Sequence, residues 1–73
     1  MTRFIRVCTG EQHLINLNTI ADIRCSNTNI SFIKSNGSEA AIFVAKNSVD
    51  ASEKFDRIAD FIQNGTDKVF YLY

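Results

Sequence analysis

The chain of 73 residues has no proline and no tryptophan, and it has only three glycines, two cysteines and one histidine. Its glycines stand singly, which excludes a phosphate-binding loop, because such a loop needs several closely spaced glycines. Cys8, Cys25 and His13 lack the short mutual spacings of a zinc site. The sequence therefore predicts neither a cofactor nor a metal.

Long apolar runs are lacking as well. The opening segment, MTRFIRVCTGEQ, contains no continuous apolar stretch of the signal-peptide type. No run approaches the ~20 apolar residues that a membrane span needs. Acidic and basic residues balance at eight each, so the chain carries no strong net charge toward nucleic acid or membrane surfaces. These absences predict a cytoplasmic protein.

Short segments in which apolar and polar residues alternate are what the chain does contain, and they are typical of β-strands. They predict the α+β class: one small antiparallel sheet of about five strands, packed against one C-terminal helix, with a short sixth strand after it. Residues 1–73 are expected to form a single domain, since the chain is too short for two. The predicted strands cover residues 3–9, 13–17, 20–26, 29–35, 38–46 and 68–73.

The two cysteines lie inside predicted strands. If the first three strands form a meander, a middle strand separates Cys8 from Cys25 by roughly 9.5 Å, more than the roughly 7 Å that a disulfide tolerates. Both are therefore expected to be buried free thiols of a reducing compartment. A four-residue loop at 9–12 would set Cys8 opposite His13, as thiolate–imidazole chemistry requires, but no third group is evident to orient the histidine. We therefore do not expect an enzyme.

Asn36-Gly37 lies between two apolar runs, and this pair favours a two-residue type I′ turn. Such a turn fixes the register of the hairpin around it. The predicted pairs are Lys34 with Glu39, Ile33 with Ala40, Phe32 with Ala41, Ser31 with Ile42 and Ile30 with Phe43. Both faces of this hairpin are partly apolar, so each needs a cover.

One cover is a helix predicted over residues 48–64. Asn47 or Ser48 is the expected N-cap, and Gly65 is expected at the C′ position. Its apolar stripe is formed by residues at helical spacing, with two neighbours extending and flanking it. The four stripe residues are Phe55, Ile58, Ala59 and Ile62, and the neighbours are Ala51 and Phe61.

The last five residues are all apolar or aromatic, and a domain of this size buries only about 60% of its unfolded surface. We therefore predict a non-enzymatic protein–protein interaction module that forms a homodimer or higher oligomer, as an adaptor or inhibitor from a bacterium, phage or other mobile element. The candidate interface is Phe32, Phe43, Val69, Phe70, Tyr71, Leu72 and Tyr73.

The alternative function is a weak nucleic-acid-binding regulator. Arg6, Arg24 and Lys34 could share one face of the sheet with Phe32, which would combine positive charge with an aromatic ring. The excess of positive charge over residues 1–47 is small, and nucleic-acid binders neutralise several phosphates. A solvated sheet face accounts for the same residues.

The order of segments from residue 4 to residue 62 resembles that of the small FlbD-type flagellar and swarming-motility proteins, and of similar short bacterial or phage proteins of unknown function. The matching positions are Ile15-Asn16, Ile20, Ile23, Gly37, Val44 and Ser48. The chain departs from the pattern at Asn47 and in its aromatic tail. The resemblance implies the same strand, hairpin and helix order, and it implies no catalytic residues.

Overall fold

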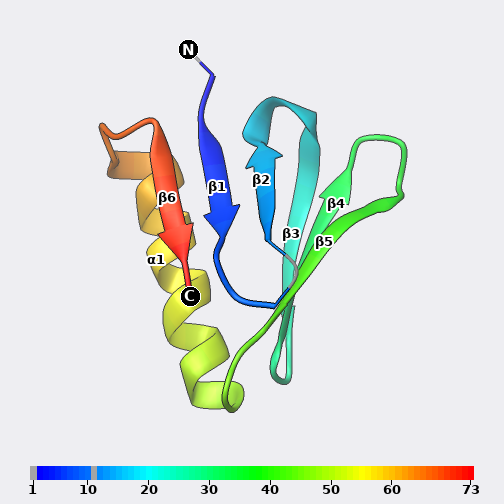
Figure 1. The fold of residues 1–73 in the computed structure, drawn as a ribbon, viewed down its shortest axis with the longest axis vertical. Coiled ribbons are helices and arrows are strands. Elements are labelled where there is room, and N and C mark those ends of the chain that lie inside the picture. The colour runs from blue at the N-terminus through cyan, green and yellow to red at the C-terminus, as the bar shows by residue number, and fades with distance from the viewer. Residues whose placement is uncertain (1, 11) are drawn as a thin grey trace.

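Six strands and one long helix follow one another in the computed structural model, which describes residues 2–10 and 12–73 (Figure 1). The first predicted loop includes residue 11, which lies outside the described residues. The elements are β1 (Phe4–Val7), β2 (His13–Asn16), the 3₁₀ turn η1 (Leu17–Thr19), β3 (Ile20–Ser26), β4 (Asn29–Lys34), β5 (Glu39–Val44), α1 (Ser48–Asn64) and β6 (Val69–Leu72).

The strands form two sheets of three rather than one sheet. In the first sheet, of order β2-β1-β6, β1 pairs antiparallel with β2 and parallel with β6. In the second, of order β3-β4-β5, all pairs are antiparallel. The α+β class is confirmed, but the prediction of about five strands in one antiparallel sheet is wrong.

The two sheets separate at η1. Asn16 Oδ1 accepts a hydrogen bond from Asn18 N at 2.9 Å, and Thr19 Oγ1 donates to Asn16 O at 2.8 Å. Such local side-chain bonds offer the backbone an alternative to strand pairing. The chain therefore turns over one 3₁₀ turn instead of a hairpin, and β3 pairs with β4 and not with β2.

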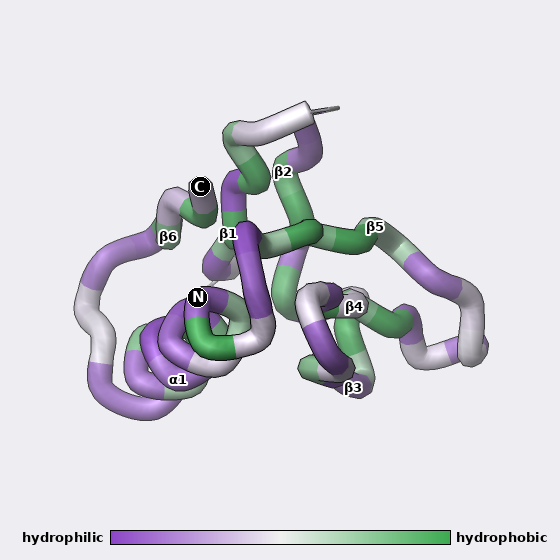
Figure 2. The backbone as a smooth tube through the Cα atoms, turned by 90° about the horizontal axis from the view of Figure 1, so that it is seen from below, coloured by the Kyte–Doolittle hydropathy of each residue, from purple (hydrophilic) through white to green (hydrophobic). Residues whose placement is uncertain are grey.

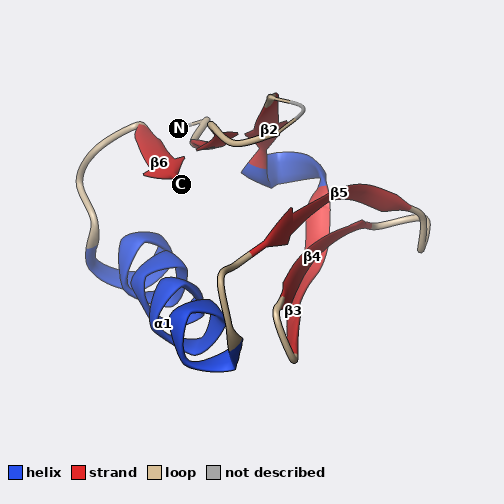
Figure 3. Cartoon of the chain, turned by 60° about the horizontal axis from the view of Figure 1, so that its bottom comes forward, coloured by secondary structure: helices blue, strands red, loops and turns tan. Residues whose placement is uncertain are grey.

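One hydrophobic core lies between α1 and the two sheets (Figures 2 and 3). Its members from α1 are Ala51, Ile58 and Phe61, whereas Ile62 is 42% exposed. The buried stripe of the helix is thus rotated from the predicted one, with Phe61 facing the core in place of Ile62. The strands contribute Ile5, Val7, Ile15, Ile30, Phe32, Ala41, Phe43 and Leu72.

The helix has the predicted bounds, and its N-terminus is held by reciprocal polar contacts. Asn47 Oδ1 accepts from Asp50 N at 2.8 Å, and Asp50 Oδ2 accepts from Lys46 N at 3.1 Å. The other oxygen of Asp50 accepts from Lys54 Nζ at 2.8 Å. The hydrogen bonds from Lys54 and from the Lys46 backbone lower the pKa of Asp50. A short polar side chain at the N-cap is typical of helix starts.

Gly65 ends the helix for a different reason from the one predicted. Its φ is −71°, which is outside the left-handed region that a C′ glycine commonly adopts. A Cβ at this position would lie 2.7 Å from Phe61 O and 3.1 Å from Arg3 Nη2. Glycine is therefore required for space at the point where Arg3 contacts the end of α1.

The tip of the β4–β5 hairpin also differs from the prediction. Lys34 O accepts from Gly37 N at 2.9 Å and Lys34 N donates to Ser38 O at 2.8 Å, so the loop has three residues. Among the described residues a positive φ occurs at Gly37 but not at Asn36, although a type I′ turn requires both. Asn36 Oδ1 instead accepts from Ser38 N at 3.0 Å and from Ser38 Oγ at 2.7 Å.

A β-bulge corrects the register a few residues later. Ile33 pairs with Glu39, and the next pair along the ladder is Phe32 with Ala41, which leaves Ala40 as the extra residue. The predicted pairs Lys34–Glu39 and Ile33–Ala40 are therefore wrong. Beyond the bulge, the predicted pairs are confirmed: Phe32–Ala41, Ser31–Ile42 and Ile30–Phe43.

Within the part of the chain that the structure describes, α1 and η1 both lack the length and apolar character that crossing a bilayer demands.

Candidate interaction surface

The two faces of the β2-β1-β6 sheet have different surroundings. Successive side chains of a strand point to opposite faces, and the inner face presents Ile5, Val7, Ile15 and Leu72 to the core. The opposite face, here called the outer face, points away from α1 and from the second sheet (Figures 1 and 2). It is formed by Phe4, Arg6, Leu14, Asn16, Val69 and Tyr71.

A row of three side chains crosses the middle of the outer face. Arg6 on the central strand is the partner of Leu14 on β2 and of Tyr71 on β6. Leu14 is 62% exposed and Tyr71 is 56% exposed, which is high for large apolar side chains. Directly opposite residues on neighbouring strands lie close enough for their side chains to touch. Arg6 thus lies between two exposed apolar side chains in one row across the sheet.

The edge of the sheet at β6 is free of any other strand within residues 2–10 and 12–73. Phe4 N donates to Lys68 O at 2.8 Å and Cys8 N donates to Leu72 O at 2.9 Å, so these carbonyls point toward β1. Since backbone groups alternate along a strand, those of Val69 and Tyr71 point to the free edge. Natural edge strands are usually protected by a charge, a proline or a bulge. Val69–Leu72 contains no charged residue and no proline, and it pairs with β1 without a bulge.

The predicted interface residues do not all lie on the surface. Phe32, Phe43 and Leu72 are at most 3% exposed, because they fill the core of their own chain. Phe70 is half-buried on the inner face, with its ring centroid 5.3 Å from that of Phe61. The prediction that these four residues lie on an exposed interface is therefore wrong.

Three of the predicted residues do reach the surface. Tyr71 is exposed on the outer face, Val69 is half-buried there, and Tyr73, after the end of β6, is 71% exposed. The sequence reasoning missed Leu14 and Phe4. The alternation of the strands indicated that these two side chains face away from the core. Leu14 is next to the buried Ile15, and Phe4 is next to the buried Ile5.

The predicted basic face does not form. Arg6 lies on the β2-β1-β6 sheet, whereas Arg24 and Lys34 lie on the β3-β4-β5 sheet. Arg24 Nε pairs with Asp22 Oδ2 at 2.7 Å, which neutralises its charge locally. Phe32, the aromatic partner expected for this face, is fully buried.

Cys8 and His13 are not directly opposite either. The strand partner of His13 is Val7, and Cys8 follows the end of β1, where its Sγ donates to Arg6 O at 3.5 Å. Both cysteines are free thiols, but neither is fully buried as predicted: Cys8 is half-buried and Cys25 is exposed on β3. The register of β1 with β2 is therefore offset by one residue from the predicted hairpin.

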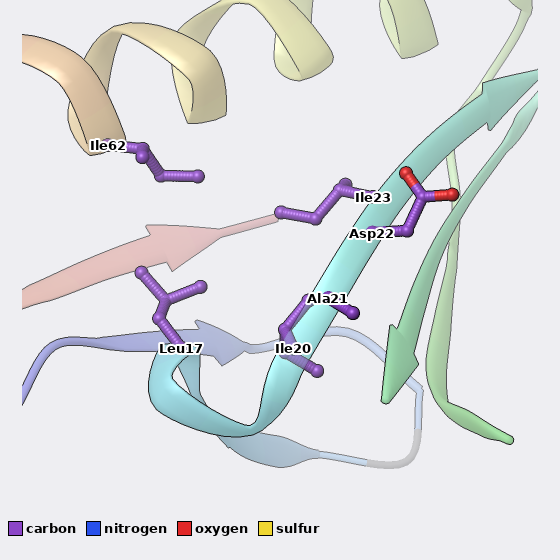
Figure 4. A pocket seen from close by; sticks show the side chains of 6 residues that line it. All are labelled: Leu17, Ile20, Ala21, Asp22, Ile23 and Ile62. Atoms are coloured by element: carbon purple, nitrogen blue, oxygen red, sulfur yellow. The ribbon is translucent and has the colours of Figure 1, made fainter. Parts of the chain in front are cut away.

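A second apolar surface is a groove of about 320 Å³ between the C-terminal end of α1 and the edge strand β3. Figure 4 shows Ile62, Ile23 and Leu17 pointing toward one another across it. Its other lining residues are Ile20, Ala21 and Asp22. The groove lies where the chain passes from the first sheet to the second at η1, and Ile62 in its wall is partly exposed.

Comparisons of the chain with protein-family models, with curated proteins and with solved structures gave no match.

Proposed function

We propose that this protein is a non-enzymatic protein–protein interaction module that self-associates through the free edge of β6 and the outer face beside it. The observation that carries this proposal is Tyr71, which is 56% exposed on an edge strand without a protecting charge, proline or bulge. An edge of this kind is a template for pairing with another chain.

The amount of exposed apolar surface supports the proposal. Leu14 and Tyr71 flank Arg6 on a face that no described helix or strand covers, and Tyr73 is exposed at the end of the same strand. Scattered apolar residues are normal on protein surfaces, but several large exposed ones gathered on one uncovered face favour an interaction site. Small domains also commonly gain stability by oligomerisation.

The setting of this module follows from the same features. The free thiols of Cys8 and Cys25 suit a reducing compartment, so we propose that the protein acts in the cytoplasm. A small adaptor or inhibitor encoded by a bacterium, phage or other mobile element fits a chain that acts by contact alone. The resemblance to the FlbD-type proteins concerns the order of segments and supports no particular process.

Light scattering on the intact chain tests the proposal. Tyr71→Lys places a charge in the middle of the unprotected strand, next to Arg6, and is expected to reduce the mass from that of an oligomer to that of the 8.2 kDa monomer. Ser38→Lys adds the same charge at an exposed position of the β4–β5 hairpin and should leave the mass unchanged. A wild-type chain that stays monomeric at millimolar concentration would refute the proposal.

A further inference from the structure

We infer that two copies of the chain pair through β6 in an antiparallel arrangement, with Tyr71 of one copy opposite Tyr71 of the other on a two-fold axis. This inference rests on the proposed self-association and assigns its symmetry and register. Most small homo-oligomers are two-fold dimers, in which the same surface of each copy meets its equivalent. Pairing through β6 would join the β2-β1-β6 sheets of the two copies into one six-stranded sheet, in the order β2-β1-β6-β6-β1-β2.

Backbone direction limits the possible registers. In an antiparallel ladder, two residues exchange hydrogen bonds only when the N–H and C=O groups of both point at the partner strand. On β6 those residues are Val69 and Tyr71, followed by Tyr73 just after the strand, because the carbonyls of Lys68 and Leu72 are already bonded to β1. Each of these three must therefore face one of the same three in the second copy.

Charge and the number of residues paired together select one register among those that remain. With Tyr71 on the axis, Val69 faces Tyr73 and Phe70 faces Leu72, so no side chain in the ladder is charged. Moving the axis to Phe70 would set Lys68 opposite Leu72, because the paired positions shift by two. The side chain of Lys68 would then lie on the inner side of the joined sheet, among the apolar groups of Phe70 and Leu72. The first register pairs the whole of Val69–Leu72 without burying a charge.

Side-chain complementarity supports the same register. On the outer face the two Tyr71 side chains become neighbours, which continues the row of Leu14, Arg6 and Tyr71 across both copies. On the inner side Phe70 comes to lie beside Leu72 of the second copy. Aromatic pairs and aromatic–aliphatic pairs are among the favourable cross-strand neighbours. The side chains of Val69–Leu72 carry no charge, so they do not repel the same side chains of a second copy.

Substitutions at Tyr71 separate backbone pairing from side-chain contact. The N–H of Tyr71 points away from β1, so Tyr71→Pro removes a donor from the free edge while the ladder between β1 and β6 keeps its hydrogen bonds. Tyr71→Val is the matched control, because it shortens the side chain and retains the N–H. We expect Tyr71→Pro to raise the dissociation constant of the dimer at least tenfold relative to Tyr71→Val. Equal dissociation constants for the two variants would overturn the inference.

An isotope-filtered nuclear Overhauser measurement on a mixture of labelled and unlabelled chains reads the register directly. Phe70 and Leu72 of different copies form a non-hydrogen-bonded pair, whose Cα atoms lie about 4.5 Å apart. We therefore expect an effect between the Hα of Phe70 in one chain and the Hα of Leu72 in the other. A dimer that lacks this effect, or that shows contacts between copies at β3 or α1 instead, would overturn the inferred register but leave self-association standing. A monomer would overturn both.

Discussion

The guanidinium carbon of Arg3 lies 4.1 Å from the centroid of the Phe61 ring, so a residue near the start of the chain closes the end of α1. The same guanidinium donates hydrogen bonds to the carbonyl of Phe61, to Ile62 O at 3.0 Å and to Gly65 O at 3.1 Å. These carbonyls belong to the last turn of the helix and the residue after it, where backbone donors run out. Phe61 O also accepts from Gly65 N at 3.1 Å, so Arg3 adds a second donor there. Arg3 thus holds the C-terminal end of α1 beside the start of β1.

Replacing Arg3 by Met should therefore destabilise the fold. The variant keeps an apolar stem but loses the charged hydrogen bonds and the contact with the Phe61 ring, and we expect a loss of about 2 kcal/mol in the free energy of unfolding. Chemical denaturation followed by circular dichroism measures it. Arg6→Met, on the exposed outer face, is the control and should change the stability by less than about 0.5 kcal/mol. Equal losses for the two variants would contradict the role given to Arg3.

Gly65→Ala tests the close approach at the same place. The backbone of Gly65 is in a region that alanine adopts readily, but its Cβ would lie 2.7 Å from Phe61 O and 3.0 Å from Phe61 Cδ1. We expect a loss of about 1–3 kcal/mol, the usual cost of overpacking. The neighbouring Asn64→Ala substitution is the control for helix-end effects, and thermal unfolding of both variants gives the comparison. Unchanged stability in Gly65→Ala would show that space at this position is not limiting.

The rotation of the helix stripe has a measurable consequence at two isoleucines. Ile58 is 1% exposed and Ile62 is 42% exposed, although both were assigned to the same apolar stripe from their spacing. Ile58→Ala should cost about 2–5 kcal/mol, because it opens a cavity in the core, and Ile62→Ala should cost less than about 1.5 kcal/mol. Urea titrations of the two variants measure the difference, and a larger loss at Ile62 would contradict the packing described.

Acid stability should depend on Asp50. Its pKa is lowered from the ordinary value of 3.8, chiefly by the hydrogen bond from Lys54 and then by that from Lys46 N. A carboxyl group whose pKa is lower in the folded state stabilises the fold above its ordinary pKa, and this contribution is lost as the pH falls through the lowered value. The wild-type chain should therefore exceed Asp50→Asn in Tm by a constant margin from pH 7 to about 5, and the margin should close below about pH 4.

A second substitution controls for the loss of one negative charge on the helix. Asp56→Asn removes an exposed carboxylate from α1 that contacts neither Lys54 nor the helix N-terminus. Tm values measured across the same pH range should show a smaller margin for this variant than for Asp50→Asn. If the margin of Asp50→Asn persisted unchanged at pH 2, the stabilising contact would not depend on the charge of Asp50.

Local signals in the sequence predicted the local structure well. The bounds of α1 followed from Asn47 at its start and Gly65 at its end, and the alternation of apolar residues indicated the strands. The pairing of the strands was harder to predict. It depends on the hydrogen bonds that the side chains of Asn16 and Thr19 make with the backbone at η1, where a 3₁₀ turn replaces the expected hairpin. The prediction of a type I′ turn at Asn36 was wrong for the same reason, because the Asn36 side chain accepts a hydrogen bond from the backbone of Ser38.

The candidate surface could be predicted only in part. An apolar segment after the helix indicated an interaction strand, but its neighbours could not be known before β6 was seen to pair with β1. That pairing decides which side chains share a face: it brings Tyr71 into one row with Arg6 and Leu14, and it sends Leu72 into the core. A surface built from residues far apart in the sequence therefore could not be predicted from each segment taken alone.

Sedimentation velocity of the unmodified chain over a range of concentrations tests the central claim most directly. If the free edge of β6 pairs with its copy, the sedimenting species should shift from 8.2 kDa toward twice that mass as the concentration rises. A single species of 8.2 kDa at every concentration, up to the millimolar range, would contradict the account.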